Sequence, residues 1–264
     1  MNFSNIVFEE MGSVARITFN RPDVRNALNP ELLGEVIQVV EYLSSSDKTR
    51  ALIITGTADI FSGGADLDFL ENNLRKQSSV QIHQFLMEYY GKAALSLRKL
   101  PFPVIAAING PAVGASFDLS LNCDIRLAAK SASMGSIWVR ICTIPALGGM
   151  YLLPRIVGYG RAAEMIFSGD IIGAEEAHRI GLVNHVYEDG ELQQKALDLA
   201  NRLAGNAPGA IRIAKNGLNR GLDGNFASEV DYAVTMQGIC LKMDDCLEGI
   251  RAFKEKRKPK FTGS

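Results

Sequence analysis

One acidic residue stands in the middle of a stretch of small and apolar residues. The segment GPAVGASFDLSLNCDI spans residues 110–125, and Asp118 lies in it between Phe117 and Leu119. Apolar surroundings disfavour the charged form of a carboxyl group and raise its pKa, which suits a group that takes up and returns protons near neutral pH. The pattern therefore predicts an acid–base residue at Asp118, with a structural carboxyl that caps a turn as the alternative.

Two turns rich in small residues each follow a predicted strand and open a predicted helix. One is FSGGADL (residues 61–67), and the other is GPAVGAS (residues 110–116). Both leave backbone N–H groups unobstructed at the positive end of a helix dipole. Two such N–H groups directed at one oxygen would form an oxyanion hole. Tight packing is the alternative for either turn alone, and neither has the glycine pattern of a phosphate or dinucleotide cradle.

The elements around these turns alternate between strands and helices. Residues 6–9 and 14–19 predict a β-hairpin, and Asn29 followed by Pro30 predicts the start of an amphipathic helix. Buried strands are predicted at ALIITG (51–56), PVIAAING (103–110) and CDIRLAAK (123–130), and a helix at about 79–98. This alternation favours an α/β fold with parallel strands.

The chain changes character near residue 190, after which four helical segments follow without a strand between them. Their apolar stripes are too wide for a small appendage to bury on itself, so contact with a neighbouring subunit is predicted. We expect a core at residues 1–195 and a C-terminal helical oligomerisation region at residues 196–264.

The composition is that of an ordinary globular protein. Of the 264 residues, 47% are hydrophobic and 22% are charged, and the net charge of −1 gives no general attraction to nucleic acid or to an anionic membrane. The three histidines and four cysteines lack the spacing of a metal site, so no metal is predicted. The N-terminal residues lack the pattern of a secretory signal. Prolines interrupt the longest uncharged run, residues 100–117, so no membrane-spanning helix is expected there. A reduced, cytoplasmic enzyme is expected.

Six segments occur in an order that identifies a family. They are RPDVRNALNPEL, ALIITGTADIFSGGADL, PVIAAINGPAVGASFDLSLNCDIRLAA, TIPALGGMYLLPRIVG, AAEMIFSGDIIGAEEAHRIGLVNHV and AFKEKRKPKF. Together they span nearly the whole chain, and they resemble the crotonase family, also called the enoyl-CoA hydratase/isomerase family. The resemblance implies an α/β fold, a spiral of ββα units whose C-terminal helical region forms homotrimers, often paired into hexamers.

The resemblance also implies an acyl-CoA thioester as substrate, with coenzyme A as part of that substrate and no permanently bound cofactor. Carried over by position, the backbone amides of Ala65 and Ala115 would hold the thioester oxygen. Removing a proton beside a thioester, or adding a nucleophile to its conjugated double bond, places negative charge on that oxygen. The two amides would stabilise the resulting enolate.

Further positions match the coenzyme-binding segments of the family. Arg25 and Ala27 match the early segment that touches the coenzyme, and the backbone of Gly63, Ala65 and Leu67 would line the adenine and pantetheine path. Lys256, in the basic run near the C-terminus, would reach the phosphates of a neighbouring subunit's ligand. A solvated surface charge is the alternative for Lys256.

The sequence departs from the usual hydratase pattern at the acids. The first of the two family glutamates falls at Asp118, but the second falls at Trp138, which cannot exchange a proton at neutral pH. A third position, used as an acid by some isomerases and dehalogenases of the family, holds Ala146. Asp118 is therefore the one obvious proton-transfer group.

Three functions remain open at this point. A single carboxylate over an enolate can move a proton from one carbon to another, which is double-bond isomerisation. Hydration of a cyclic or dienoyl-CoA would need other groups to hold the water, such as Ser116, the Trp138 indole N–H, or Tyr89 or Tyr90. Trp138 could equally form a flat pocket wall or pack beside the pocket. A catalytically silent acyl-CoA-binding protein is the third alternative, and RNA binding by the C-terminal basic residues has little support.

Overall fold

The computed structural model describes residues 1–264 and is built around a six-stranded sheet in the order β1-β2-β3-β4-β6-β9. The strands are β1 (Ile6–Met11), β2 (Val14–Phe19), β3 (Ala51–Gly56), β4 (Val104–Ile108), β6 (Ile125–Ala129) and β9 (His185–Tyr187). The first two form the predicted antiparallel hairpin, and every later pair in this sheet is parallel. The expected α/β class and the parallel pairing of the buried strands are confirmed.

A smaller sheet contains three short strands in the order β5-β7-β8. These are β5 (Ala112–Val113), β7 (Ser133–Gly135) and β8 (Ile171–Gly173). β5 and β7 run parallel, and β7 and β8 run antiparallel. Because β5 lies between β4 and the helix that carries Asp118, this second sheet fixes where that helix begins.

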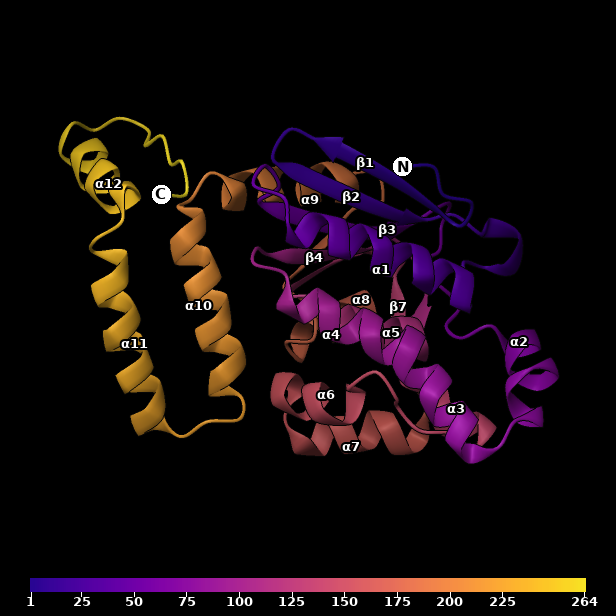
Figure 1. The fold of residues 1–264 in the computed structure, drawn as a ribbon. Coiled ribbons are helices and arrows are strands. Elements are labelled where there is room, and N and C mark those ends of the chain that lie inside the picture. Colours follow the sequence, from indigo (N-terminus) through magenta and orange to yellow (C-terminus); the bar gives the residue numbers. More distant parts are fainter.

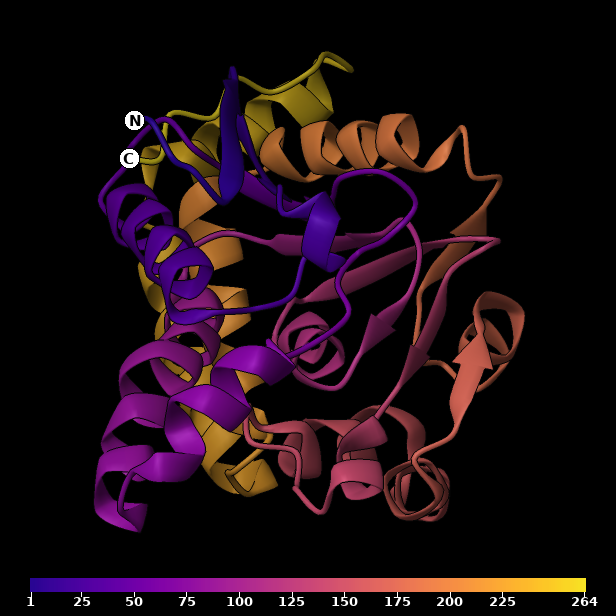
Figure 2. The ribbon, with the colours of Figure 1, turned by 90° about the vertical axis from the view of Figure 1, so that its right-hand side faces the viewer.

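The chain contains twelve α-helices. Most of them lie around the sheets (Figures 1 and 2). They are α1 (Pro30–Ser44), α2 (Leu67–Asn72), α3 (Ser79–Leu86), α4 (Lys92–Lys99), α5 (Ala115–Leu121), α6 (Gly149–Val157), α7 (Tyr159–Ser168), α8 (Ala174–Arg179), α9 (Leu192–Ala204), α10 (Pro208–Gly221), α11 (Phe226–Cys240) and α12 (Asp244–Lys254). Short 3₁₀ turns occur at Pro22–Val24, Leu74–Lys76 and Ile137–Ile141.

Local sequence signals explain several of these boundaries. The Asn29 side chain accepts a hydrogen bond from Leu32 N at 2.9 Å, and Pro30 is the first residue of α1, as predicted. The helix expected at about 79–98 is interrupted by a π-helical turn at Met87–Gly91. This turn places the Tyr90 hydroxyl in the interior, where it donates to the Leu28 carbonyl at 2.8 Å.

Helix α9 covers one face of the main sheet, where it packs against β2, β3, β4, β6 and β9. Its buried residues Ala196, Ala200 and Ala204 recur every four positions, so small side chains face the strands along one stripe of the helix. Residues 196–204 thus pack on the sheet. The division of the chain at residue 195 remains a prediction.

Helices α10, α11 and α12 extend away from the body of the molecule (Figure 1). α10 packs against α11, and α11 has no buried residue. Several large apolar side chains of this segment are strongly exposed, among them Leu218, Phe226, Val234 and Phe253. No helix of the chain combines the length and the apolar character needed to cross a bilayer.

Candidate active site

The two small-residue turns lie side by side. Ser62 pairs with Ala112 as an isolated parallel bridge, with Ser62 N donating to Pro111 O at 3.0 Å and Val113 N donating to Ser62 O at 3.4 Å. The Ser116 hydroxyl is fully buried and donates to Ser62 O at 2.7 Å. Ser116, a predicted pocket residue, therefore ties one turn to the other in this structure.

Gly64 allows the two turns to approach closely. Its φ is +94°, a conformation that favours glycine, and a Cβ added there would lie 2.6 Å from Val113 O and 3.5 Å from Ala115 N. Within their turns, neither Ala65 N–H nor Ala115 N–H donates a hydrogen bond. Ala115 is also the first residue of α5, so its N–H has no carbonyl acceptor within the helix. Both amides remain available to an added acceptor.

The early segment around Arg25 lies along the first turn. Gly63 N donates to Arg25 O at 2.8 Å, and Leu28 N donates to Gly64 O at 2.7 Å. The structure thus brings Arg25 and Ala27 beside Gly63 and Ala65. Leu67 begins α2 and is 58% exposed.

Lys256 lies far from these residues in the same chain. It follows the end of α12, which is on the opposite side of the molecule from α2 (Figure 1). Within its basic run, Arg257 is paired with Glu248 at 2.6 Å and also with Glu255, whereas Lys256 is exposed and has no acidic partner.

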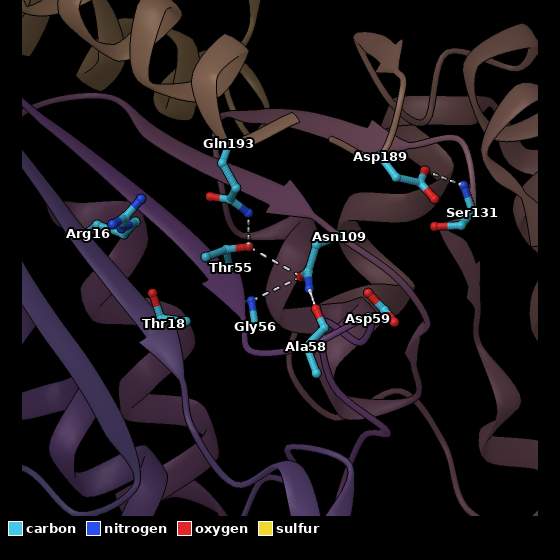
Figure 3. A pocket seen from close by; sticks show the side chains of 10 residues that line it. All are labelled: Arg16, Thr18, Thr55, Gly56, Ala58, Asp59, Asn109, Ser131, Asp189 and Gln193. Atoms are coloured by element: carbon cyan, nitrogen blue, oxygen red, sulfur yellow. Dashed lines mark hydrogen bonds between the residues drawn. The ribbon is translucent and has the colours of Figure 1, made fainter. Parts of the chain in front are cut away.

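Two asparagine side chains hold the loop that leads into the first turn. Asn109 Oδ1 accepts from Gly56 N at 3.0 Å, and its Nδ2 donates to Ala58 O at 2.7 Å (Figure 3). Asn26, which is fully buried, donates to Ile60 O in the same loop at 3.1 Å. The sequence alone does not reveal this role of Asn109 and Asn26, because it depends on contacts between segments far apart in the chain.

Asp118 is fully buried on α5. Its Oδ2 accepts from Leu147 N at 3.4 Å, whereas its Oδ1 has no hydrogen-bond partner. Burial raises the pKa of Asp118 to about 7, against smaller lowering effects from the Leu147 amide and the Trp138 indole. A Cβ at Gly149, the first residue of α6, would overlap Oδ1, so only glycine fits there without a shift.

Trp138 lies in the 3₁₀ turn Ile137–Ile141 and is 8% exposed. Its Nε1–H faces the Asp118 carboxyl closely enough to lower the pKa of that group, yet the two side chains do not form a hydrogen bond of acceptable geometry. Nε1 has no other partner. The nearby Ser136 hydroxyl is also buried without a partner, and Ala146 is exposed.

The polar hollow of Figure 3 is lined by residues at the ends of β3 and β4 and in the loops beside them, and Asp118 is not among them. Its lining includes Asn109, Asp59 and, from α9, Gln193, which donates to the Thr55 hydroxyl at 2.9 Å. None of the predicted site residues lines it. No group of three or more His, Cys, Asp or Glu side chains is arranged to hold a metal ion.

Comparison with known protein families shows which family has this fold and sequence. The family model described as enoyl-CoA hydratase/isomerase matches residues 9–264. The chain belongs to the enoyl-CoA hydratase/isomerase family. It is an acyl-CoA enzyme of this type, and the resemblance inferred from the six sequence segments is confirmed.

Individual relatives are similar in sequence over nearly the whole of this chain. A short-chain-enoyl-CoA hydratase of Clostridium acetobutylicum is 35% identical over 259 residues, covering 98% of this chain and 97% of that protein. The mouse mitochondrial methylglutaconyl-CoA hydratase is also 35% identical, over 97% of this chain and 81% of that protein.

Solved structures match equally well. An enoyl-CoA hydratase from Bacillus anthracis superposes with a TM-score of 0.94 at 35% identity, covering 99% of this chain and 100% of that one. An enoyl-CoA hydratase from Polaromonas sp. JS666 gives a TM-score of 0.92 at 31% identity, over 97% and 99% of the two chains. The crotonase-type fold and its C-terminal helical region are thereby confirmed.

Proposed function

We propose that the chain stabilises a thioester enolate between the amides of Ala65 and Ala115, with Asp118 as the single proton-transfer group. The observation that carries the proposal is the close approach of the two turns at Gly64, with both N–H groups left without an acceptor. A preorganised pair of amide donors stabilises charge that develops during reaction, and losing one donor typically costs about 3 kcal/mol.

Asp118 fits the role of acid and base in this scheme. A carboxyl with a pKa of about 7 is present in both forms near neutral pH, so it can remove a proton from one carbon and return it to another. Because the carboxyl has no exposed surface, the proposal requires that the incoming acyl group displace the side chains in front of it. The simplest outcome is double-bond isomerisation.

A one-acid hydratase is the second candidate. The relatives named above are hydratases, and the unpartnered Trp138 N–H supplies a donor where the family's second glutamate would stand. A catalytically silent acyl-CoA-binding protein is the third candidate, and it would keep the amides without proton transfer.

Assembly and coenzyme binding extend the proposal. Arg25, Ala27, Gly63 and Leu67 would line the path of the coenzyme. The exposed apolar residues of α10–α12 would be covered in a homotrimer or a dimer of trimers, and Lys256 would then reach the phosphates bound to a neighbouring subunit. We place the enzyme in the cytoplasm, with no nucleic-acid or membrane partner.

Proton exchange tests the core of the proposal. The enzyme is incubated with butyryl-CoA in deuterated water, and label beside the thioester is followed by mass spectrometry. We expect exchange with the wild type and a loss of about 100-fold or more with Asp118→Asn. Equal labelling by both proteins, or none by either, contradicts the proposal.

A further inference from the structure

Two buried polar atoms near each other at the predicted reaction centre, one a donor and one an acceptor, lack a hydrogen bond of acceptable geometry. Asp118 Oδ1 belongs to α5 and Trp138 Nε1 to the 3₁₀ turn Ile137–Ile141, and neither atom has a hydrogen-bond partner. Both side chains are more than nine-tenths buried. Buried polar atoms without partners are uncommon in folded proteins, so a matched donor and acceptor at one place point to a ligand atom that bridges them.

The chemistry of the two groups restricts what can bridge them. The indole nitrogen only donates a hydrogen bond, and an ionised carboxylate only accepts one. A group between them must therefore accept from Trp138 and donate to Asp118. Water and hydroxyl groups do both, whereas a carbonyl or carboxylate oxygen cannot donate and an ammonium group cannot accept.

We propose that Trp138 Nε1–H and Asp118 Oδ1 form a binding site for one oxygen at Cβ of the acyl chain. This oxygen is the attacking water in the enoyl complex and the hydroxyl in the 3-hydroxyacyl product. The inference rests on the proposed function and selects its hydratase form. The Trp138 N–H then holds this oxygen by donating a hydrogen bond to it, in place of the second acid of a two-glutamate site. Trp138 takes no part in proton transfer.

The reaction balances with one acid. The water oxygen forms a bond to Cβ, and its proton passes to the Asp118 carboxylate. The π electrons of the carbon–carbon double bond move toward the thioester, whose oxygen is held as an enolate by the amides of Ala65 and Ala115. Asp118 then returns the proton to Cα, so that one water is added across the double bond. The reverse sequence removes water.

Trp138 is the only tryptophan of the chain, so its fluorescence reports directly on this site. The wild-type enzyme is titrated separately with 3-hydroxybutyryl-CoA and with butyryl-CoA, which lacks the hydroxyl. A new hydrogen bond at the indole N–H shifts emission to longer wavelength, so we expect the shift with the hydroxyl compound alone. Identical spectra for the two bound ligands overturn the proposal without any substitution in the protein.

Kinetics provide the second test. The enzyme is incubated in ¹⁸O-labelled water with crotonyl-CoA and, separately, with branched and cyclic enoyl-CoA esters, and hydration is measured. Exchange of the butyryl-CoA protons is measured in parallel. With Trp138→Phe, which keeps an aromatic ring and removes the N–H, we expect the kcat of hydration to fall about 10- to 100-fold while exchange stays within about threefold.

A matched control removes another unpartnered polar group. Ser136→Ala deletes the buried hydroxyl two residues from Trp138, and we expect it to leave hydration within about threefold of wild type. Retained hydration in Trp138→Phe, or equal loss of hydration and exchange, overturns the oxygen site. A wild type that exchanges butyryl-CoA but hydrates no ester overturns the oxygen site while leaving the enolate proposal intact. A wild type that does neither overturns the enolate proposal as well.

Discussion

At the scale of single residues, the burial of Asp118 makes the stability of the protein depend on pH. Its folded pKa of about 7 lies above the ordinary value of 3.8, so the folded protein binds the proton more tightly than the unfolded chain. The stability contributed by this group is complete at low pH and is lost as the pH rises through about 7. Above that pH, the protein retains a buried charge that only one hydrogen bond supports.

The first prediction follows from this balance. Asp118→Asn replaces the charge with a neutral group of the same shape, so at pH 8 the variant should unfold with a free energy higher by on the order of a few kcal/mol. The gain should shrink as the pH falls toward 3.8. Denaturant unfolding at several pH values measures it, and a variant no more stable than wild type at pH 8 would show that the carboxyl is not desolvated.

A second prediction concerns the pH dependence of proton exchange. Removal of a proton from butyryl-CoA needs the carboxylate form of Asp118, so the exchange rate should rise with pH through about 7 and then level off. Exchange measured at low butyryl-CoA concentration reports the free enzyme. A profile that is flat between pH 6 and 8, or that falls through this range, would exclude Asp118 as the base.

The burial of Asp118 and its raised pKa were predictable from its apolar neighbours, but its unpaired oxygen was not. The segment around residue 118 shows that a carboxyl will be buried. It does not show that Trp138 faces this carboxyl or that Gly149 packs against it, because those contacts join α5 to segments 20 to 31 residues away. That Trp138 replaces a second acid is implied only by the resemblance to the family, and it stays a prediction.

At the scale of elements, the first turn depends on side chains that clamp its approach. The Asn109 side chain connects the ends of β3 and β4 to the loop at residues 57–61 (Figure 3). The Asn26 side chain also donates to this loop, at the Ile60 carbonyl. At Gly110 a Cβ would overlap the Asp59 carbonyl, so the backbones of the two loops are also in close contact. This clamp fixes the backbone that leads to Ala65.

The third prediction tests this clamp. Asn109→Asp keeps the acceptor for Gly56 N but loses the Nδ2 donor to Ala58 O, so the loop should shift and the kcat of exchange should fall about 10- to 100-fold. Gln193→Ala is the matched control, because Gln193 bonds to Thr55 in the same hollow without touching the loop, and we expect near wild-type exchange. Equal rates for the two variants would argue against a role of the clamp in positioning.

Local patterns predicted the regular elements well and the irregular ones poorly. Buried strands, the Asn29–Pro30 helix start and the small-residue turns all follow from neighbouring residue types. The strands of the second sheet are two or three residues long, which is too short to show the alternation of apolar and polar residues typical of a strand. The π-helical turn at Met87–Gly91 was not predicted either, since its sequence continues the pattern of an ordinary helix.

At the scale of the whole molecule, the C-terminal helices have apolar surface without a covering. Leu218, Phe226 and Phe253 are each more than 70% exposed, although aromatic and aliphatic side chains of this size are usually buried. A homotrimer would cover such residues. It would also move the end of α12, which lies far from the Asp118 side of its own chain, toward the site of another subunit.

The last prediction uses two defective subunits to test this arrangement. Lys256→Ala should raise the KM for acyl-CoA about tenfold with little change in kcat, because an exposed lysine contributes binding to phosphate rather than chemistry. Asp118→Asn should be inactive at any substrate concentration. When the two are co-expressed, some sites combine the intact Asp118 of one subunit with the intact Lys256 of another, so exchange at low butyryl-CoA concentration should exceed the average of the separate proteins.

The same variants purified separately and mixed without subunit exchange provide the control. If Lys256 served the site of its own chain, or none at all, co-expression would produce no gain, and the shared-site trimer would have to be abandoned.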